Sequence, residues 1–231
     1  MAKVGWFGKI PALGDFASYN LAQEFIEIWD LWLQHGIATS RASLGAGWLD
    51  SYLTAPIWYF SLFPDIVGSQ AWTGLLMPSV DKVGRHFPLT IAMPLESDGA
   101  AVVRTFGQQG WYAALGDIAL STLSLDYPAR QLETDLDALP PPGNGVDPNV
   151  AAARVLADWW QGDSGETTCV LEAPPEPAGS VLADVGGCLL AASARGRSLW
   201  WRHSEHGWPQ VVHGFHGLPP ELRFERLLDG A

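Results

Sequence analysis

Cysteine and charged residues are scarce in this chain of 231 residues. The only cysteines are Cys169 and Cys188, and only 16% of the residues are Asp, Glu, Lys or Arg. Two cysteines at this separation match neither a disulfide framework nor a zinc site, so we interpret them as small buried residues in a reducing compartment. With 48% apolar residues, the chain is long enough to bury a large core.

Long apolar runs are also missing. No segment approaches the ~18 uninterrupted apolar residues of a transmembrane helix. The first residues, MAKVGWFGKIPALGDF, contain Lys3 and Lys9 but no long apolar core, which argues against a secretory signal. We therefore expect a cytoplasmic protein with no direct membrane insertion.

The sequence lacks the motifs of several enzyme classes. Neither G-x-S-x-G nor H-E-x-x-H occurs, and no glycine-rich dinucleotide fingerprint follows a predicted strand. Gly8-Lys9 has neither the glycine spacing nor the Ser or Thr of a phosphate loop, because Ile10 follows the lysine. We predict no catalytic residue from these motifs and no cofactor.

Four histidines gather near the end of the chain, in HSEHGWPQVVHGFH. They are His203, His206, His213 and His216. Imidazole is a common zinc ligand, but structural sites built from histidine alone are unusual, and the segment reads as a loop. We therefore predict no metal site, and the role of these histidines stays open.

Acidic residues and tryptophan are abundant instead. The net charge is −12, and residues 116–185 carry twelve acids against two bases. This balance repels a phosphate backbone, so nucleic acid is excluded as a partner. Two interpretations remain: the acidity steers a basic protein surface to the chain, or it keeps a protein with 12 tryptophans soluble. Composition alone favours the second.

The hydrophobic pattern of the first half predicts two helices and four strands. YNLAQEFIEIWDLWLQHG (residues 19–36) has helical spacing, with Asn20 and Gln23 as a capping box and Gly36 at its end. A shorter helix is expected within residues 43–56. Strands are expected at residues 3–7, 57–63, 72–80 and 88–95. The last three are almost continuously apolar, which predicts central strands covered on both faces.

The second half predicts helices within residues 101–123 and 149–160, separated by the breaker LPPPGNGVDPN at 139–149. A strand hairpin is expected over residues 187–202, and a helix over 219–230. This order predicts an α/β protein with a mixed sheet and helices on its faces. We treat residues 1–231 as one domain, because the part after the break has too few strong elements for its own core.

A charged cluster interrupts two apolar runs in LLMPSVDKVGRHFPLTIAMPL, residues 75–95. Its members, bracketed by Pro78 and Pro88, are Asp81, Lys82, Arg85 and His86. A partly exposed Asp81–Arg85 pair would contribute only ~0–1 kcal/mol, too little to explain the cluster as a stabilising device. The cluster therefore predicts contact with another molecule. The alternative is a small ligand-binding protein or hydrolase that uses Asp15, Asp81 and His86 in a cleft.

The same segments resemble the TagF family, also called ImpM, of accessory proteins of the bacterial type VI secretion system. GWFGKIPALGDF, FIEIWDLWLQ, APIWYFSLF and WTGLLMPSVDKVGRHFPLT carry the resemblance, which is dense over residues 5–95. It implies a cytoplasmic, non-enzymatic repressor that acts post-translationally by binding the forkhead-associated scaffold protein. It also implies a three-layer α/β sandwich with a mixed central sheet and helices on both faces.

Two motifs match the family position by position. The matching residues are Gly8, Lys9, Pro11, Gly14, Asp15 and Phe16, and then Pro78, Ser79, Asp81, Gly84, Arg85, Phe87 and Pro88. The resemblance implies no catalytic role for any of them. The predicted partner-binding residues are Lys9, Asp15, Ser79, Asp81, Lys82, Arg85 and His86. Trp58 and Trp72 are candidate anchors for a partner, although core packing is the favoured interpretation of both.

Overall fold

One sheet of seven strands organises the computed structural model, which describes residues 3–95, 101–102, 105, 108–142, 178–203, 209–221 and 224–229. The strand order is β2-β1-β5-β4-β3-β6-β7, and each described pairing is antiparallel. The strands are β1 (Gly5–Gly8), β2 (Ala17–Tyr19), β3 (Trp58–Leu62), β4 (Ala71–Met77), β5 (Leu89–Leu95), β6 (Arg197–His203) and β7 (Pro209–His216).

The predicted α/β class is confirmed, but the predicted mixed sheet is wrong for the pairings that the structure describes. Parallel neighbours need a crossover connection of a dozen or more residues. The connections from β3 to β4 and from β4 to β5 are shorter than that, so these strands turn back on themselves. The hairpin of β6 and β7 extends the same sheet beyond β3.

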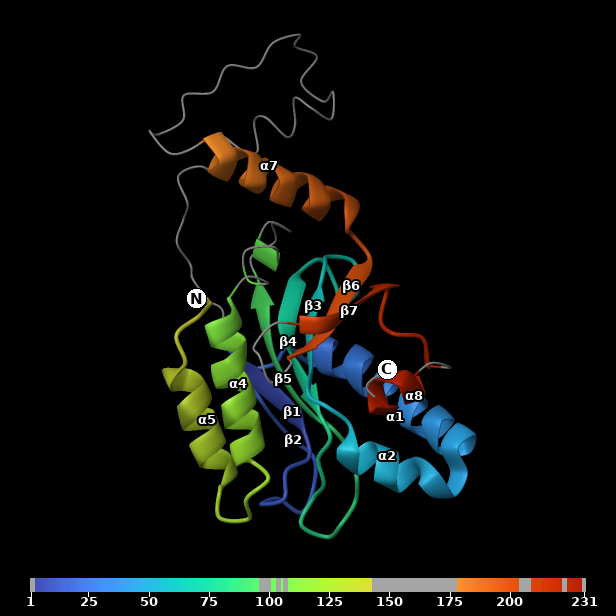
Figure 1. The fold of residues 1–231 in the computed structure, drawn as a ribbon. Coiled ribbons are helices and arrows are strands. Elements are labelled where there is room, and N and C mark those ends of the chain that lie inside the picture. The colour runs from blue at the N-terminus through green and yellow to red at the C-terminus, as the bar shows by residue number, and fades with distance from the viewer. Residues whose placement is uncertain are drawn as a thin grey trace.

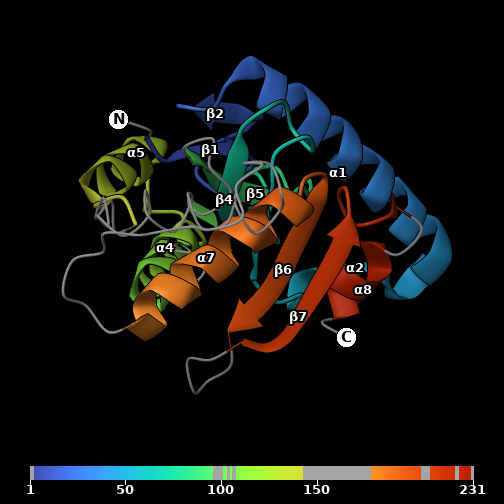
Figure 2. The ribbon, with the colours of Figure 1, turned by 90° about the horizontal axis from the view of Figure 1, so that it is seen from above.

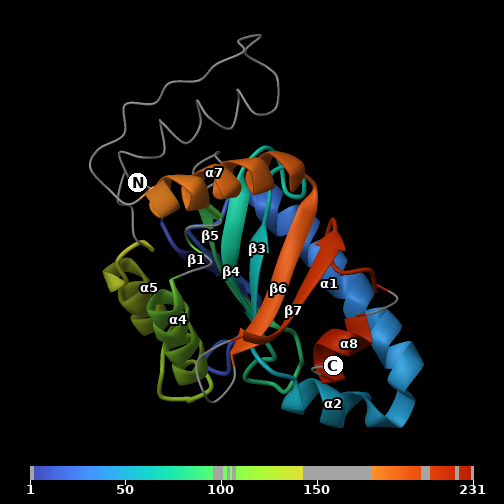
Figure 3. The same ribbon diagram turned by 45° about the horizontal axis from the view of Figure 1, so that its top comes forward.

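Helices lie on both faces of the sheet (Figures 1 and 2). The one face carries α1 (Gln23–Leu44), α2 (Trp48–Thr54) and α8 (Phe224–Asp229), which contact one another. The other face carries α4 (Gln109–Ser121) and α5 (Ala129–Ala138). The helix α7 (Ala178–Ser193) crosses the end of the sheet opposite the β4–β5 connection (Figure 3). No described helix combines the length and the apolar character that crossing a membrane requires.

Side chains that alternate along the strands fill a separate core on each face. On β5, Ile91 joins the core under α4, whereas Ala92 joins the core under α1. All residues of β3 and β4 are buried, which confirms the expectation of central strands covered on both faces. In the core under α1, the Trp29 Nε1–H donates to Thr90 Oγ1 at 2.8 Å. In the other core, the indole N–H groups of Trp6 and Trp111 have no hydrogen-bond partner among the residues that the structure describes.

The first predicted helix exists, but its ends differ from the prediction. α1 begins at Gln23 without a side-chain cap, because Asn20 has a positive φ of 53° at the end of β2. Gly36 does not end the helix. A Cβ at Gly36 would lie 2.3 Å from Cδ2 of Phe224, so the glycine provides the space in which α8 packs. The helix ends at Leu44, before Gly45 with φ 54°.

Two predictions for the second half were wrong. Residues 187–193 of the segment 187–194, predicted as a strand, lie in α7, because an apolar run rich in Ala and Leu fits either element by pattern and favours helix by propensity. The described residues of the histidine segment, which was predicted as a loop, belong to the end of β6 and to β7. The helix α5 and the strand β2 were not predicted, and the predicted helix at 149–160 lies outside the described residues.

We predict that Gly36→Ala destabilises the protein, because the added methyl group meets the Phe224 ring. Overpacking of this kind costs about 1–3 kcal/mol and lowers the melting temperature by roughly 2–4 °C per kcal/mol. Gly110→Ala in α4 is the control, because no heavy atom lies within 4 Å of its added Cβ. Thermal unfolding followed by circular dichroism tests both, and a Gly36→Ala variant as stable as Gly110→Ala would contradict the packing argument.

Candidate functional site

The connection between β4 and β5, residues 78–88, is an ordered hairpin that we call the Pro78–Pro88 loop. Its backbone closes on itself: the Phe87 N–H donates to the Ser79 carbonyl at 3.1 Å, and the Asp81 N–H donates to the Arg85 carbonyl at 3.1 Å. Gly84 at the tip has a φ of 84°, a conformation that glycine adopts without strain. The loop therefore has a defined shape before any partner binds.

The carboxylate of Asp81 lies at the centre of this loop and is only 3% exposed. Its Oδ1 accepts the backbone N–H groups of Val83 and Arg85 at 3.0 and 2.9 Å. Its Oδ2 accepts Lys9 Nζ at 2.9 Å and Arg85 Nε at 2.7 Å. Each oxygen is thus satisfied by two donors, as a buried ionised carboxylate requires.

The donors decide the charge of Asp81. Burial by itself raises the pKa of the carboxyl, but the hydrogen bonds from the Arg85 backbone, Lys9, the Arg85 side chain and Val83 lower it further than burial raises it. The net result is a pKa well below the usual range for aspartate. A carboxylate held in this way stays ionised and is a poor general acid or base near neutral pH.

Lys9 reaches Asp81 from the first motif, directly after β1. The strand ends at Gly8, where φ is 131° and an added Cβ would lie 2.1 Å from the Pro88 carbonyl oxygen, so only glycine fits this approach. The Lys9 side chain is 5% exposed, and its ammonium lies 4.6 Å from the centre of the Phe16 ring. Lys9 therefore joins the two sequence motifs in one buried contact.

Arg85 is the member of this group that solvent reaches, because 54% of its side chain is exposed. Its Nη2 donates to the Gly14 carbonyl at 2.5 Å and lies 3.7 Å from Oδ1 of Asp15. The backbone N–H of Lys82 donates to the Leu13 carbonyl at 2.8 Å. The β1–β2 loop and the Pro78–Pro88 loop are thus held side by side, and their exposed side chains share one surface.

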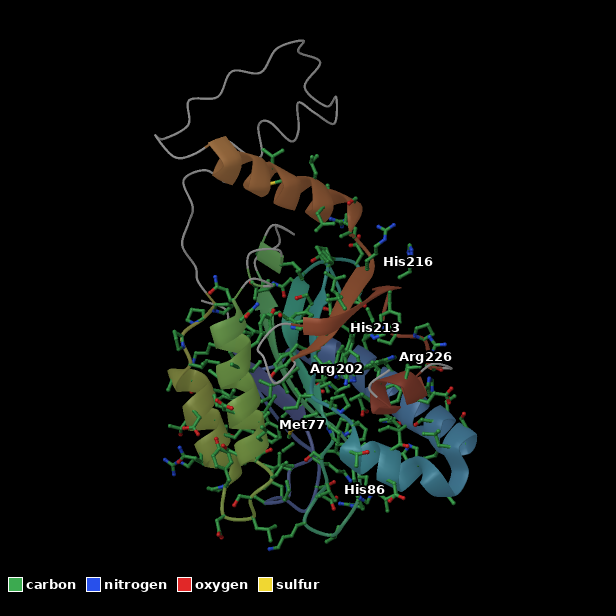
Figure 4. All side chains as sticks on the ribbon, viewed as in Figure 1. Met77, His86, Arg202, His213, His216 and Arg226 are labelled. Carbon is green, nitrogen blue, oxygen red and sulfur yellow. The ribbon has the colours of Figure 1, made fainter. Side chains whose placement is uncertain are left out.

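Ser79 and His86 face α2, on the other side of the loop. The Tyr52 hydroxyl donates to the Ser79 carbonyl at 2.8 Å and accepts the Ser79 N–H at 3.0 Å. Burial raises the pKa of Tyr52, so this hydroxyl stays neutral. The half-buried His86 ring meets the rings of Trp48 and Tyr52 edge-on, and Figure 4 shows it beside α2.

The structure divides the seven predicted partner-binding residues into two groups. The side chains of Lys9, Ser79 and Asp81 are buried; Lys9 and Asp81 hold the loop through their side chains, whereas Ser79 holds it through its backbone. The accessible side chains are those of Asp15, Lys82, Arg85 and, in part, His86. Sequence reasoning missed Tyr52, which fixes the base of the loop and carries no motif that would have indicated this role.

The alternative acid–base set does not form among the described residues. No hydrogen bond there joins His86 to Asp15 or Asp81, because His86 faces α2 whereas Asp15 approaches Arg85 from the opposite side. The oxygens of Asp81 are already occupied by donors. The arrangement therefore offers a rigid polar surface, but no proton-transfer pair.

Two of the four C-terminal histidines can be placed. His213 and His216 lie on β7, remote from the Pro78–Pro88 loop (Figure 4). The centre of the His213 ring lies 5.3 Å from the centre of the Trp58 ring. The side chains of His203 and His206 lie outside the described residues. Among the residues that can be described, no three metal-binding side chains gather.

Trp58 and Trp72, 2% and 4% exposed, are core residues, as favoured from the sequence.

Lys9→Met is predicted to destabilise the fold, because it removes one cation from a buried carboxylate. Breaking a buried pair from one side costs about 3 kcal/mol, which corresponds to a fall in melting temperature of roughly 6–12 °C. Lys82→Met, at an exposed position in the same loop, should change the free energy of unfolding by less than about 0.5 kcal/mol. Equal melting temperatures for the two variants would contradict a structural role for Lys9.

The contribution of Asp81 should also depend on pH. Its pKa is lower in the folded state than in the unfolded chain, so the unfolded chain takes up the proton first as the pH falls. The stabilisation is therefore complete at neutral pH and is lost with falling pH, beginning near the ordinary aspartate pKa of about 4. Urea unfolding should show a difference in the free energy of unfolding between wild type and Asp81→Asn, and this difference should become smaller as the pH falls. A difference that grows as the pH falls would exclude this linkage.

Comparison with known proteins places these features in a family. A family profile described as "TagF N-terminal domain, Type VI secretion system-associated" matches residues 5–139. A similar solved structure is the crystal structure of PA0076 from Pseudomonas aeruginosa PAO1. Its sequence is 33% identical to that of this chain, and the two structures superpose with a TM-score of 0.75. The alignment covers 99% of this chain and 94% of that one. No curated protein sequence matches. The chain therefore belongs to the TagF family of proteins associated with the type VI secretion system.

Proposed function

We propose that this protein is a cytoplasmic repressor of the type VI secretion system that acts by binding the system's forkhead-associated scaffold protein. Family membership supports the secretion system as its setting, and the family resemblance of the two motifs suggests the scaffold as partner. The observation that carries the docking proposal is the Pro78–Pro88 loop. Buried contacts of Lys9 and Asp81 fix it, while Lys82, Val83 and Arg85 point to solvent.

A loop of fixed shape suits recognition of a protein. Little conformational entropy is lost when such a loop binds, so more of the contact energy appears as affinity. Arginine is enriched among residues that dominate binding energy, and Arg85 keeps donor groups and half of its surface available after pairing with Asp81. We infer that the loop covers a scaffold surface that assembly of the secretion system needs.

The same geometry favours a protein without enzymatic activity. The candidate acid–base residues face different sides of the loop, and the carboxylate of Asp81 is used to hold the loop together. A repressor that acts by occlusion requires a stable surface and no reacting group. Exposed charges at this surface would then set the rate of association and the choice of partner.

Arg85→Ala is expected to weaken binding of the purified scaffold protein by at least about tenfold, or about 1.4 kcal/mol, because it removes an exposed cation of the surface. Biolayer interferometry measures the affinity, and thermal unfolding verifies the fold. Arg195→Ala is the matched control, since Arg195 is 58% exposed and also pairs with an aspartate, Asp65, at 2.7 Å. Equal affinities of the two variants would exclude Arg85 from the interface.

A further inference from the structure

The strand β7 is the last strand of the sheet, and β6 pairs with one side of it only (Figure 3). An edge strand presents a row of backbone N–H and C=O groups that have no neighbour in the sheet. Among the described residues, no backbone hydrogen bond joins β7 to any element except β6. A strand from another molecule can therefore pair with this open edge.

The hydrogen-bond pattern of the hairpin identifies the groups at the open edge. In an antiparallel pair, residues whose backbones bond across the pair alternate with residues whose backbones point away. The Gly217 N–H, just beyond β7, donates to the Gly196 carbonyl at 2.7 Å, so these two residues bond across the hairpin. The Phe63 N–H donates to the Arg197 carbonyl at 3.0 Å, so Arg197 faces β3 and its partner His216 faces away from β6. The backbones that face the open edge are those of Val212, Gly214 and His216.

The devices that usually protect an edge strand are missing from β7. Native proteins blunt their edges with lysine, with an internal proline, with a bulge or by keeping the strand short. The strand β7 spans eight residues, its only proline is its first residue, and PQVVHGFH contains no Asp, Glu, Lys or Arg. The register shifts only at the start of the strand. At the opposite edge of the sheet, β2 has only three residues.

The packing of one copy does not require the glycine in the middle of the open edge. A Cβ added at Gly214 would have Cδ2 of Leu199 as its nearest neighbour, at the ordinary contact distance of 3.8 Å. In β4, by contrast, a Cβ added at Gly74 would collide with the Ile91 carbonyl. Glycine weakens the interior of a strand and often marks a place where another backbone approaches closely. Gly214 therefore indicates an approach from outside the single chain.

The distribution of charge favours a second copy of this chain as the occupant of the edge. Two chains that each carry a net charge of −12 repel each other, most strongly where their acids are concentrated. Residues 116–185 contain twelve acids and two bases, whereas residues 195–216 contain one acid and three bases. The helices α4 and α5, which carry part of the acidic charge, lie away from β7 (Figure 2). Two copies can therefore approach each other at β7 with little repulsion.

We propose that β7 pairs antiparallel with β7 of a second copy, so that two seven-stranded sheets join across a two-fold axis. With the axis at Gly214, this glycine lies opposite its own symmetry mate, and Val212 lies opposite the second copy's His216. The backbones that face the open edge then bond to one another. This inference is independent of the proposed function, because β7 is remote from the Pro78–Pro88 loop (Figure 4).

The same register brings aromatic rings together on the face that carries α1. Within one copy the His213 and Phe215 rings are stacked, with 6.1 Å between their centres and 10° between their planes. Pairing about Gly214 places His213 of each copy opposite Phe215 of the other. Aromatic pairs across antiparallel strands stabilise a sheet. The strand is therefore complementary to itself in its side chains as well as in its backbone.

Gly214→Pro tests the pairing, because it removes an N–H at the axis that one copy does not use. Proline is tolerated in an edge strand where its nitrogen faces solvent, so the variant should still fold, which thermal unfolding verifies. Sedimentation velocity should show dimers of wild type, and dimerisation of Gly214→Pro should be at least about tenfold weaker. Gly214→Ala is the matched control: it keeps the N–H, one copy has room for its Cβ, and it should dimerise like wild type.

Two further measurements do not depend on the folding of Gly214→Pro. Gly214→Lys keeps the N–H but places two ammonium groups opposite each other at the axis, which should weaken dimerisation by roughly threefold or more. In wild type, amide hydrogen exchange at the open edge should become at least about tenfold slower at concentrations that favour the dimer. The amides of His213 and Phe215, which bond to β6, should be protected at every concentration.

A wild type that sediments as a monomer up to about 1 mM would overturn the proposal. A dimer that both Gly214→Pro and Gly214→Lys leave unchanged would do the same, because it would use another surface. Exchange at Val212, Gly214 and His216 that does not change with concentration would also contradict the pairing. None of these measurements involves the scaffold protein, so their outcome is separate from that of the proposed function.

Discussion

The buried carboxylate of Asp81 is the contact on which the candidate site depends. Four donors from two distant parts of the chain converge on its oxygens, and the most remote of them, Lys9, lies 72 residues away in sequence. Desolvating a carboxylate is costly, so the site is stable only while these donors stay in place. The carboxylate therefore couples the first strand to the β4–β5 connection and fixes the surface that both loops expose.

A buried ion pair adds little net stability compared with apolar packing, but separating its partners leaves an uncompensated buried charge, which is costly. In this protein the ion pair between Lys9 and Asp81 determines where the neighbouring side chains lie. With Lys9 and Asp81 in contact, Arg85 extends across the β1–β2 loop and donates to the Gly14 carbonyl.

The strands β3, β4 and β5 and the core of α1 could be predicted from sequence, because aromatic and β-branched runs and the spacing of Phe25, Trp29 and Trp32 are local signals. Gly36 misled the prediction: glycine is typical of helix ends, but this one faces Phe224, which is distant in sequence. The apolar segment of α7 was misread as a strand because short apolar runs fit either element.

The sequence by itself determined the family, the central strands, the long helix and the residues that make up the polar cluster, because these depend on local period and on motif. Only the tertiary structure decided that Asp81 is buried while Arg85 is exposed, and that His86 faces α2. Desolvation depends on which distant segments cover a group. The spacing of residues along the chain cannot determine which groups are buried. Burial is determined by the pairing of β1 with β5 in the sheet and by the packing of α2 and α8.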